Sequence, residues 1–251
     1  MCRIATITHF GKERISPAEV KSFLLNMEAG GKDATGIAFV DKERITFSKY
    51  PGSASNVISP RFEEVTQDYI NSSHAIILHT RSATHGSPLD NKNNHPLFGK
   101  KYMLVHNGIV NLDEKFTANG ETDSEQLLLA MEKYGIKKGL EKASGWASII
   151  WVNYKTRDKV YFYKNSFGSL VGAIDDVKKI FILASTKNII LNSYNSKDLK
   201  FFEIKPEMVY CIDFVDKEIK SLFEAKMKQK VIYSYGYKFA EVGDYYFPMY
   251  A

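Results

Sequence analysis

Helix-start signals occur at two places in this chain of 251 residues, and most of the remaining sequence alternates as β-strands do. Ser16 and Glu19 have the spacing of a capping box, and Thr122 and Glu125 repeat it. Strands are predicted near residues 3–10, 36–40, 44–50, 74–80, 102–106, 147–153, 159–163, 179–184 and 208–214, with a third, short helix over 62–70 and polar loops over 51–61 and 81–100. This order predicts an α+β protein with largely antiparallel sheets, folded as a single domain over residues 1–251.

The composition is that of a globular protein and points away from membranes and nucleic acids. Hydrophobic residues make up 44% and charged residues 25%, and we find no apolar run of about 18 residues and no secretory signal. The net charge is +5, but lysines and acidic residues interleave, which favours a solvated surface over a phosphate-binding one. The only two cysteines, Cys2 and Cys211, are far apart, so we expect a reducing, cytoplasmic location.

Histidines are concentrated in one region, because five of the six lie between residues 74 and 106. A metal site would require clustered ligands, but the chain has neither a His-x-x-x-His pair on a helix nor a cysteine pair. The pattern therefore favours a polar pocket in which loop residues position a small charged ligand. We expect no metal and no cofactor.

The cysteine directly behind Met1 has two interpretations. It could be a small residue at the start of a buried strand, or it could have a chemical role. If Met1 is removed, Cys2 becomes a nucleophile with its own α-amine beside it. An unperturbed α-amine has a pKa of about 7.7–8.0, so it can accept the thiol proton near neutral pH.

Five short segments then share one order and spacing with a known family. Residues 33–38 read DATGIA, 79–86 read HTRSATHG, 94–96 read NHP, 105–109 read VHNGI and 121–125 read ETDSE. Together with Cys2 they resemble the class II glutamine amidotransferase domain, an N-terminal-nucleophile (Ntn) hydrolase, most closely the glutaminase domain of glucosamine-6-phosphate synthases. The resemblance implies an αββα sandwich of two antiparallel sheets.

The resemblance also implies a role for each matched residue. Cys2 would attack the side-chain amide of L-glutamine, and Asn107 and Gly108 would stabilise the oxyanion. Arg81 would bind the α-carboxylate of glutamine and Asp123 its α-ammonium group. Thr84 and His85 would line the same pocket. The products would be glutamate and ammonia, formed through a thioester.

Three positions depart from the family pattern. Ser82 stands where the family usually has Trp, residues 164–170 replace its Arg-x-Gly-Ser-Pro-Leu segment, and Thr186 replaces an Asp. The resemblance covers about residues 2–185, which leaves a strand-rich, aromatic extension over about 186–251. We therefore expect a stand-alone enzyme that passes ammonia to a separate synthase subunit or to solvent, and a homo-oligomer is an option.

Two alternatives stay open. The same nucleophile could serve an Ntn amidase that acts on another γ-glutamyl amide, because the surroundings of the pocket differ from the family pattern. The chain could instead be a non-catalytic binding module, with aromatic residues of the tail as an interaction surface; these alternate over 231–239 and recur over 245–250.

Overall fold

The computed structural model describes residues 1–228. Seven strands form the first sheet, in the order β11-β9-β10-β1-β4-β2-β3, and all neighbouring pairs are antiparallel. They are β1 (Arg3–His9), β2 (Ala34–Val40), β3 (Ile45–Pro51), β4 (Ala75–Arg81), β9 (Val171–Asp175), β10 (Ile180–Ala184) and β11 (Leu199–Glu203). Because β1 lies at the centre of this sheet, Cys2 precedes its central strand.

Six strands form the second sheet, in the order β13-β12-β8-β7-β6-β5, again antiparallel throughout. They are β5 (Leu97–Phe98), β6 (Tyr102–Leu112), β7 (Ala143–Asn153), β8 (Lys159–Lys164), β12 (Met208–Asp213) and β13 (Glu218–Glu224). The segment beyond residue 185 therefore adds strands to both sheets, whereas its predicted aromatic stretches over 231–239 and 245–250 lie outside the described residues.

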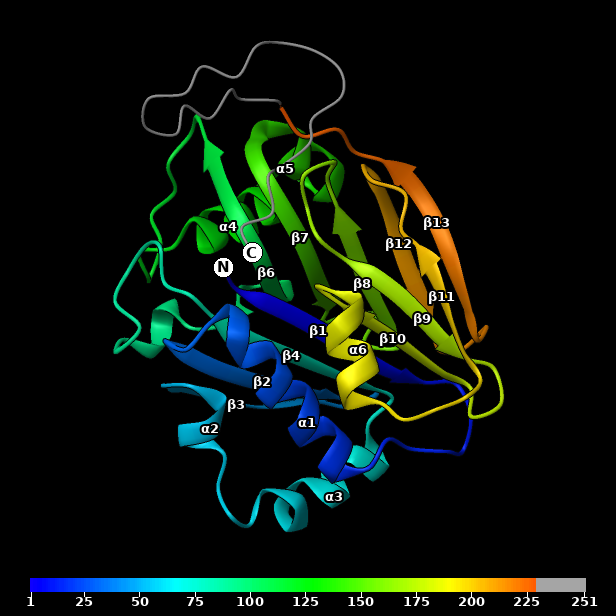
Figure 1. Ribbon diagram of the computed structural model, residues 1–251. Helices are drawn as coiled ribbons and strands as arrows, with labels where there is room; N and C mark the ends of the chain where they lie inside the picture. Colours follow the sequence, from blue (N-terminus) through cyan, green and yellow to red (C-terminus); the bar gives the residue numbers. More distant parts are fainter. Residues whose placement is uncertain (229–251) are drawn as a thin grey trace, which may run out of the picture.

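The two sheets stack face to face, and helices cover their outer faces (Figure 1). One apolar cluster fills the space between the sheets, a second lies between the first sheet and its helices, and a third lies beneath the helices of the second sheet. The first sheet carries α1 (Pro17–Met27), α3 (Phe62–Ser72) and α6 (Lys187–Ser193), and the second carries α4 (Asp123–Tyr134) and α5 (Ile136–Lys142). The predicted αββα sandwich is confirmed.

Both predicted capping signals begin helices. At α1 the Glu19 amide donates to Ser16 Oγ at 3.2 Å, and the Ser16 amide donates to Glu19 Oε2 at 2.9 Å. At α4 the Glu125 amide donates to Thr122 Oγ1 at 3.2 Å. These bonds satisfy amides that have no partner within a helix's first turn, and so they fix where each helix starts.

Several elements differ from the sequence prediction. The helices α2 (Ala54–Val57), α5 and α6 and the strands β5, β9, β11 and β13 were not predicted. Two short 3-10 turns were not predicted either: η1 (Glu28–Gly30) follows α1, and η2 (Asn91–Asn93) lies in the long loop. The strand predicted to end at His106 continues to Leu112. Residues Asn107 and Gly108 pair with Ser148 and Ala147 of β7, so they lie within a strand and not in a turn.

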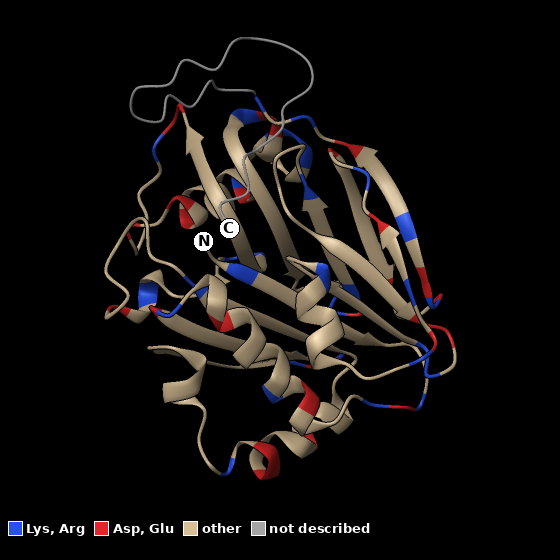
Figure 2. Cartoon of the chain, in the orientation of Figure 1, with Lys and Arg blue, Asp and Glu red and all other residues tan. Residues whose placement is uncertain are grey.

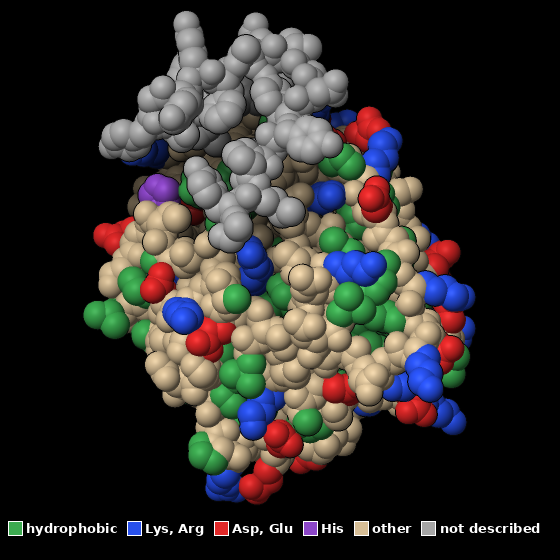
Figure 3. Space-filling model, viewed as in Figure 1, with side chains coloured by type: hydrophobic (Ala, Val, Ile, Leu, Met, Phe, Trp, Pro, Cys, Tyr) green, Lys and Arg blue, Asp and Glu red, His purple; other side chains and the backbone are tan. Residues whose placement is uncertain are grey.

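Charged residues lie mainly in helices, in loops and near the ends of strands (Figure 2). On the face shown in Figure 3, basic and acidic side chains are interspersed over the described surface. No helix within residues 1–228 is long and apolar enough to cross a membrane.

Candidate active site

The Cys2 thiol lies against the backbone of Ser82, which follows β4. Ser82 N–H donates to Sγ at 3.3 Å, and Sγ lies 3.4 Å from the Ser82 carbonyl oxygen. Burial raises the pKa of the Cys2 thiol, and the Ser82 amide, the N-terminus and Arg81 oppose this rise, whereas Asp123 adds to it. The thiol is therefore held protonated at rest and needs a base to form the nucleophilic thiolate.

The buried Arg81 guanidinium holds the loop that follows β4. Nη1 donates to Asn94 Oδ1 at 2.9 Å, and Nη2 donates to the carbonyl oxygens of His85 and Gly86 at 2.5 and 2.9 Å. Burial lowers the pKa of Arg81, while Cys2 and two carboxylates, one of them Asp123, act in the opposite direction. Asn94 was not among the predicted site residues, although it lies in the NHP segment.

Asn107 lies on β6, in the sheet opposite Cys2, and its side chain is buried. Its Nδ2 donates to Ser185 Oγ at 3.3 Å, and no described residue bonds to its Oδ1. Ser185 also accepts the Ile4 amide proton at 2.9 Å. Ser185 therefore connects Asn107 to the strand that follows Cys2. No local sequence motif predicts this contact.

Gly108 follows Asn107 at a position that has no space for a side chain. A Cβ atom there would lie 2.1 Å from the Trp146 carbonyl oxygen and 2.4 Å from His106 Nε2. Glycine is therefore required for β6 and β7 to pair at this register.

Asp123 is the first residue of α4, and its carboxylate accepts two backbone amides. Val110 N–H donates to Oδ2 at 2.8 Å and Ser124 N–H donates to Oδ1 at 2.9 Å. A carboxylate at the start of a helix is also favoured by the helix dipole. Because the charge of Asp123 acts on both Cys2 and Arg81, the fold brings together three residues that are far apart in the sequence.

Thr84 and His85 are exposed members of the loop that Arg81 holds, and Thr84 Oγ1 lies 3.2 Å from His85 Nδ1. Asp33 fixes the same loop, because its Oδ2 accepts the Ala83 amide proton at 2.7 Å. Asp33 belongs to the predicted DATGIA segment but had no assigned role. It supports the loop through the backbone.

Three buried histidines lie behind the site. His79 stacks on His95 with ring centroids 4.1 Å apart, and His79 Nε2 lies 3.1 Å from the His106 carbonyl oxygen. His106 Nδ1 lies 2.9 Å from Ser124 Oγ. Burial lowers the pKa of all three, that of His79 to about 3. The clustered histidines of the sequence are thus mainly neutral packing groups.

Comparison with known proteins identifies the family. The family described as "Glutamine amidotransferases class-II" matches residues 22–143. The chain contains a class II glutamine amidotransferase domain. A glutamine–fructose-6-phosphate aminotransferase (isomerizing) of Clostridium tetani is 30% identical over 242 residues, which cover 88% of this chain and 38% of that protein. One of Caldanaerobacter subterraneus is 28% identical and covers 95% of this chain and 41% of its own length.

This class II domain therefore spans about two-fifths of the length of those relatives. Among solved structures, a glutamine phosphoribosylpyrophosphate amidotransferase of B. subtilis superposes with a TM-score of 0.65 at 18% identity, covering 88% of this chain and 49% of that one. A class II glutamine aminotransferase domain protein of Silicibacter pomeroyi superposes with a TM-score of 0.51 at 15% identity, covering 89% and 99%. These likenesses support the fold.

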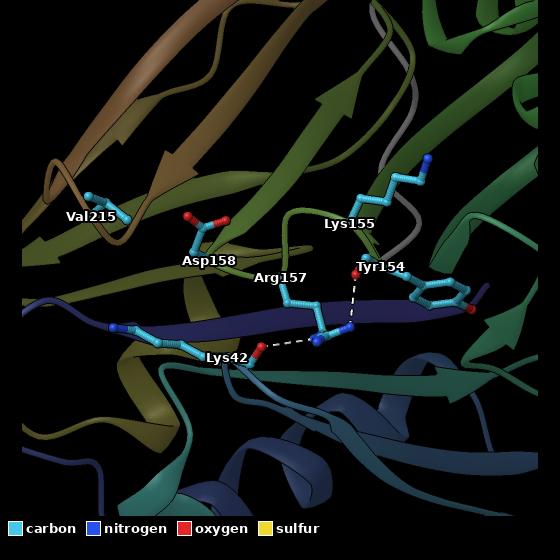
Figure 4. A pocket seen from close by; sticks show the side chains of 6 residues that line it. All are labelled: Lys42, Tyr154, Lys155, Arg157, Asp158 and Val215. Atoms are coloured by element: carbon cyan, nitrogen blue, oxygen red, sulfur yellow. Dashed lines mark hydrogen bonds between the residues drawn. The ribbon is translucent and has the colours of Figure 1, made fainter.

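A separate cavity of the class II domain has a volume of about 320 Å³ and contains none of the predicted site residues. It lies between three turns and is lined by Lys42, Tyr154, Lys155, Arg157, Asp158 and Val215 (Figure 4). Arg157 donates to the carbonyl oxygens of Lys42 and Tyr154, and the two lysines point away from it. The basic side chains that line the cavity therefore do not converge on one point. Within residues 1–228, no group of three or more His, Cys, Asp or Glu could hold a metal ion.

Proposed function

We propose that this chain is a stand-alone class II glutaminase that hydrolyses the side-chain amide of L-glutamine to glutamate and ammonia. One observation carries the proposal: the charges of Arg81 and Asp123 both act on the Cys2 thiol. Glutamine bears one anion and one cation at its α-carbon. A pocket that offers one fixed cation and one fixed anion beside a thiol matches that substrate.

Arg81 retains the capacity to bind a carboxylate in this arrangement. A guanidinium has five N–H donors, and three contacts to Asn94, His85 and Gly86 occupy three of them. The other two, one on Nε and one on Nη1, can donate to the α-carboxylate of glutamine. Asp123 supplies the opposite charge for the α-ammonium group, and Thr84 and His85 line the pocket from the loop.

The reaction begins once Met1 has been removed. The Cys2 α-amine takes the thiol proton, directly or through a water, and Sγ forms a bond to the amide carbon while the C=O π electrons move to oxygen. Asn107 Nδ2 and the Gly108 amide donate to that oxyanion. The C–N bond then breaks, ammonia leaves with the proton from the amine, and water hydrolyses the thioester to release glutamate.

We propose that the ammonia passes to a separate synthase subunit, or to solvent, and that residues 1–251 act as one domain in a reducing compartment. Pull-down of binding proteins from a lysate, followed by assay of ammonia transfer with each, would identify the acceptor. Self-association into a homo-oligomer is tested by sedimentation.

The decisive test is covalent labelling by a glutamine-like electrophile such as 6-diazo-5-oxo-norleucine, mapped by mass spectrometry. We expect one adduct on Cys2 of the Met-processed protein, together with release of glutamate and ammonia from glutamine. Cys2→Ala should abolish both, whereas Cys211→Ser, on buried β12, serves as the matched control and should keep both. Absence of both labelling and hydrolysis in processed, folded protein would reject the proposal.

A second substrate class is favoured by one observation: Ser82, whose backbone contacts the Cys2 thiol, stands where the family usually has Trp. A serine leaves more volume there than the family's usual Trp, which would suit a larger leaving group on the γ-amide. A substrate panel separates the two: a clear preference for free glutamine over N-substituted γ-glutamyl amides excludes this option. Retention of Met1 in the native host would instead favour a non-catalytic binding module.

A further inference from the structure

Arg3 places a guanidinium beside the backbone of the proposed nucleophile. Its Nη1 donates to the Cys2 carbonyl oxygen at 3.3 Å. That oxygen is separated from the Cys2 nitrogen by only three covalent bonds. When Met1 is absent, this nitrogen is the α-amine, so a fixed positive charge lies next to the group that must act as a base.

The structure makes room for Arg3 at this position. A Cβ atom on Gly30, in η1, would lie 2.4 Å from Arg3 Cγ and 2.8 Å from Arg3 Nε. Gly30 is buried, and any larger residue would displace the arginine side chain. The close packing of Arg3 over Gly30 therefore fixes where the charge lies.

No carboxylate neutralises this arginine within residues 1–228. Arg3 takes part in none of the ion pairs found there, and burial lowers its pKa, while the neighbouring Cys2 has the opposite effect. From η1, the Glu28 carboxylate is turned to Ser55, bonding its amide at 2.7 Å and its hydroxyl at 3.0 Å. The charged groups that face the Cys2 thiol from other elements are Arg81 of β4 and Asp123 of α4.

We propose that Arg3 is an electrostatic positioning residue that keeps the Cys2 α-amine in its neutral, proton-accepting form and favours the thiolate. A nearby cation disfavours the ammonium form and stabilises the thiolate, so both changes increase the population of the reactive pair at neutral pH. Arg3 does not contact the substrate in this assignment. The inference rests on the proposed role of Cys2 as nucleophile.

The test measures how fast iodoacetamide alkylates Cys2 as a function of pH, using Met-processed protein checked by intact mass. Arg3→Gln and Arg3→Met remove the charge, and Arg3→Lys keeps it. At a separation of about 6 Å, one charge shifts a partly exposed group by about 0.5–1 pH unit. We expect the alkylation midpoint to rise by that amount in both uncharged variants and to stay within 0.2 unit in Arg3→Lys.

Coincident profiles for the wild type and a folded uncharged variant would overturn the proposal. If Arg3→Gln does not fold, Arg3→Met keeps an apolar stem over Gly30 and gives the same comparison. Alkylation by iodoacetamide requires no glutamine chemistry, so this result is obtained even if the chain proves not to be a glutaminase. Conversely, if the charge of Arg3 has no effect on alkylation, the proposal that Cys2 hydrolyses glutamine still stands.

Discussion

Asn107 donates its side-chain Nδ2–H to the hydroxyl of Ser185 at 3.3 Å, although the two residues are 78 positions apart. Ser185 follows β10 in the first sheet, and Asn107 belongs to β6 in the second. The same hydroxyl accepts the amide proton of Ile4, two residues after Cys2. A single buried serine thus sets the position of the proposed oxyanion donor relative to the strand of the proposed nucleophile.

Ser185→Ala should therefore lower both stability and activity. The change leaves the Ile4 amide without this acceptor and frees the Asn107 side chain, and each lost buried hydrogen bond costs about 1–3 kcal/mol. We expect the free energy of unfolding in urea to fall by about that amount and kcat for glutamine to fall by about tenfold. Ser221→Ala, on the exposed strand β13, is the control and should change neither.

Asn107→Ala should affect catalysis far more than stability. The side chain has one hydrogen bond and an Oδ1 that bonds to no described residue, so its removal costs about 0.5–1.5 kcal/mol of folding free energy. Loss of one oxyanion donor typically lowers kcat by about 10²–10³-fold. Glutamate release is the measurement. The control is Asn111→Ala, four residues later on β6 and exposed; equal losses in both variants would contradict the assignment of Asn107.

The sequence was sufficient for those parts of the fold that depend on local signals. The capping residues Ser16 and Thr122 begin helices as predicted, and the apolar alternation over 3–10 and 147–153 lies within central strands. The strand predicted over 102–106 was too short, because the Asn107–Gly108 pair that follows it favours a tight turn in isolation. Here pairing with β7 overrides that preference, and Gly108 is needed for close approach to Trp146.

The helices and strands that the sequence missed have weak local signals. Gly135 ends α4 with φ 81°, but α5 begins at the next residue. In the site, the DATGIA, HTRSATHG and VHNGI segments located the main residues. Ser185 and Asn94 were missed because their contacts depend on how distant strands and loops fold onto one another. The roles assigned to the site residues stay predictions.

Arg81→Lys tests the arginine as the group that organises the loop. An ammonium cannot reproduce the planar set of donors that now bonds Asn94, His85 and Gly86. We expect a loss of about 2–3 kcal/mol in unfolding free energy and a KM for glutamine raised by at least tenfold. Arg44→Lys is the control, since that exposed arginine forms only a surface ion pair with Asp41.

Acid should destabilise the protein because the fold buries neutral histidines. Burial lowers the pKa of His9 and of His79 to about 3, from an ordinary value of 6.5. Between these values the unfolded chain binds more protons than the folded one, so stability falls as the pH falls. At pH 5 the cost is about 2 kcal/mol for each of the two histidines relative to pH 7.5.

Urea unfolding measured at half-unit steps from pH 7.5 to 4.5 checks this expectation. The free energy of unfolding should fall steadily below pH 6.5, and His9→Gln, outside the site, should reduce the slope because one neutral ring is gone. His85→Gln is the matched control, since His85 is exposed and its replacement should leave the slope unchanged. A free energy that stays constant down to pH 5 would mean that the folded protein can protonate these rings in place.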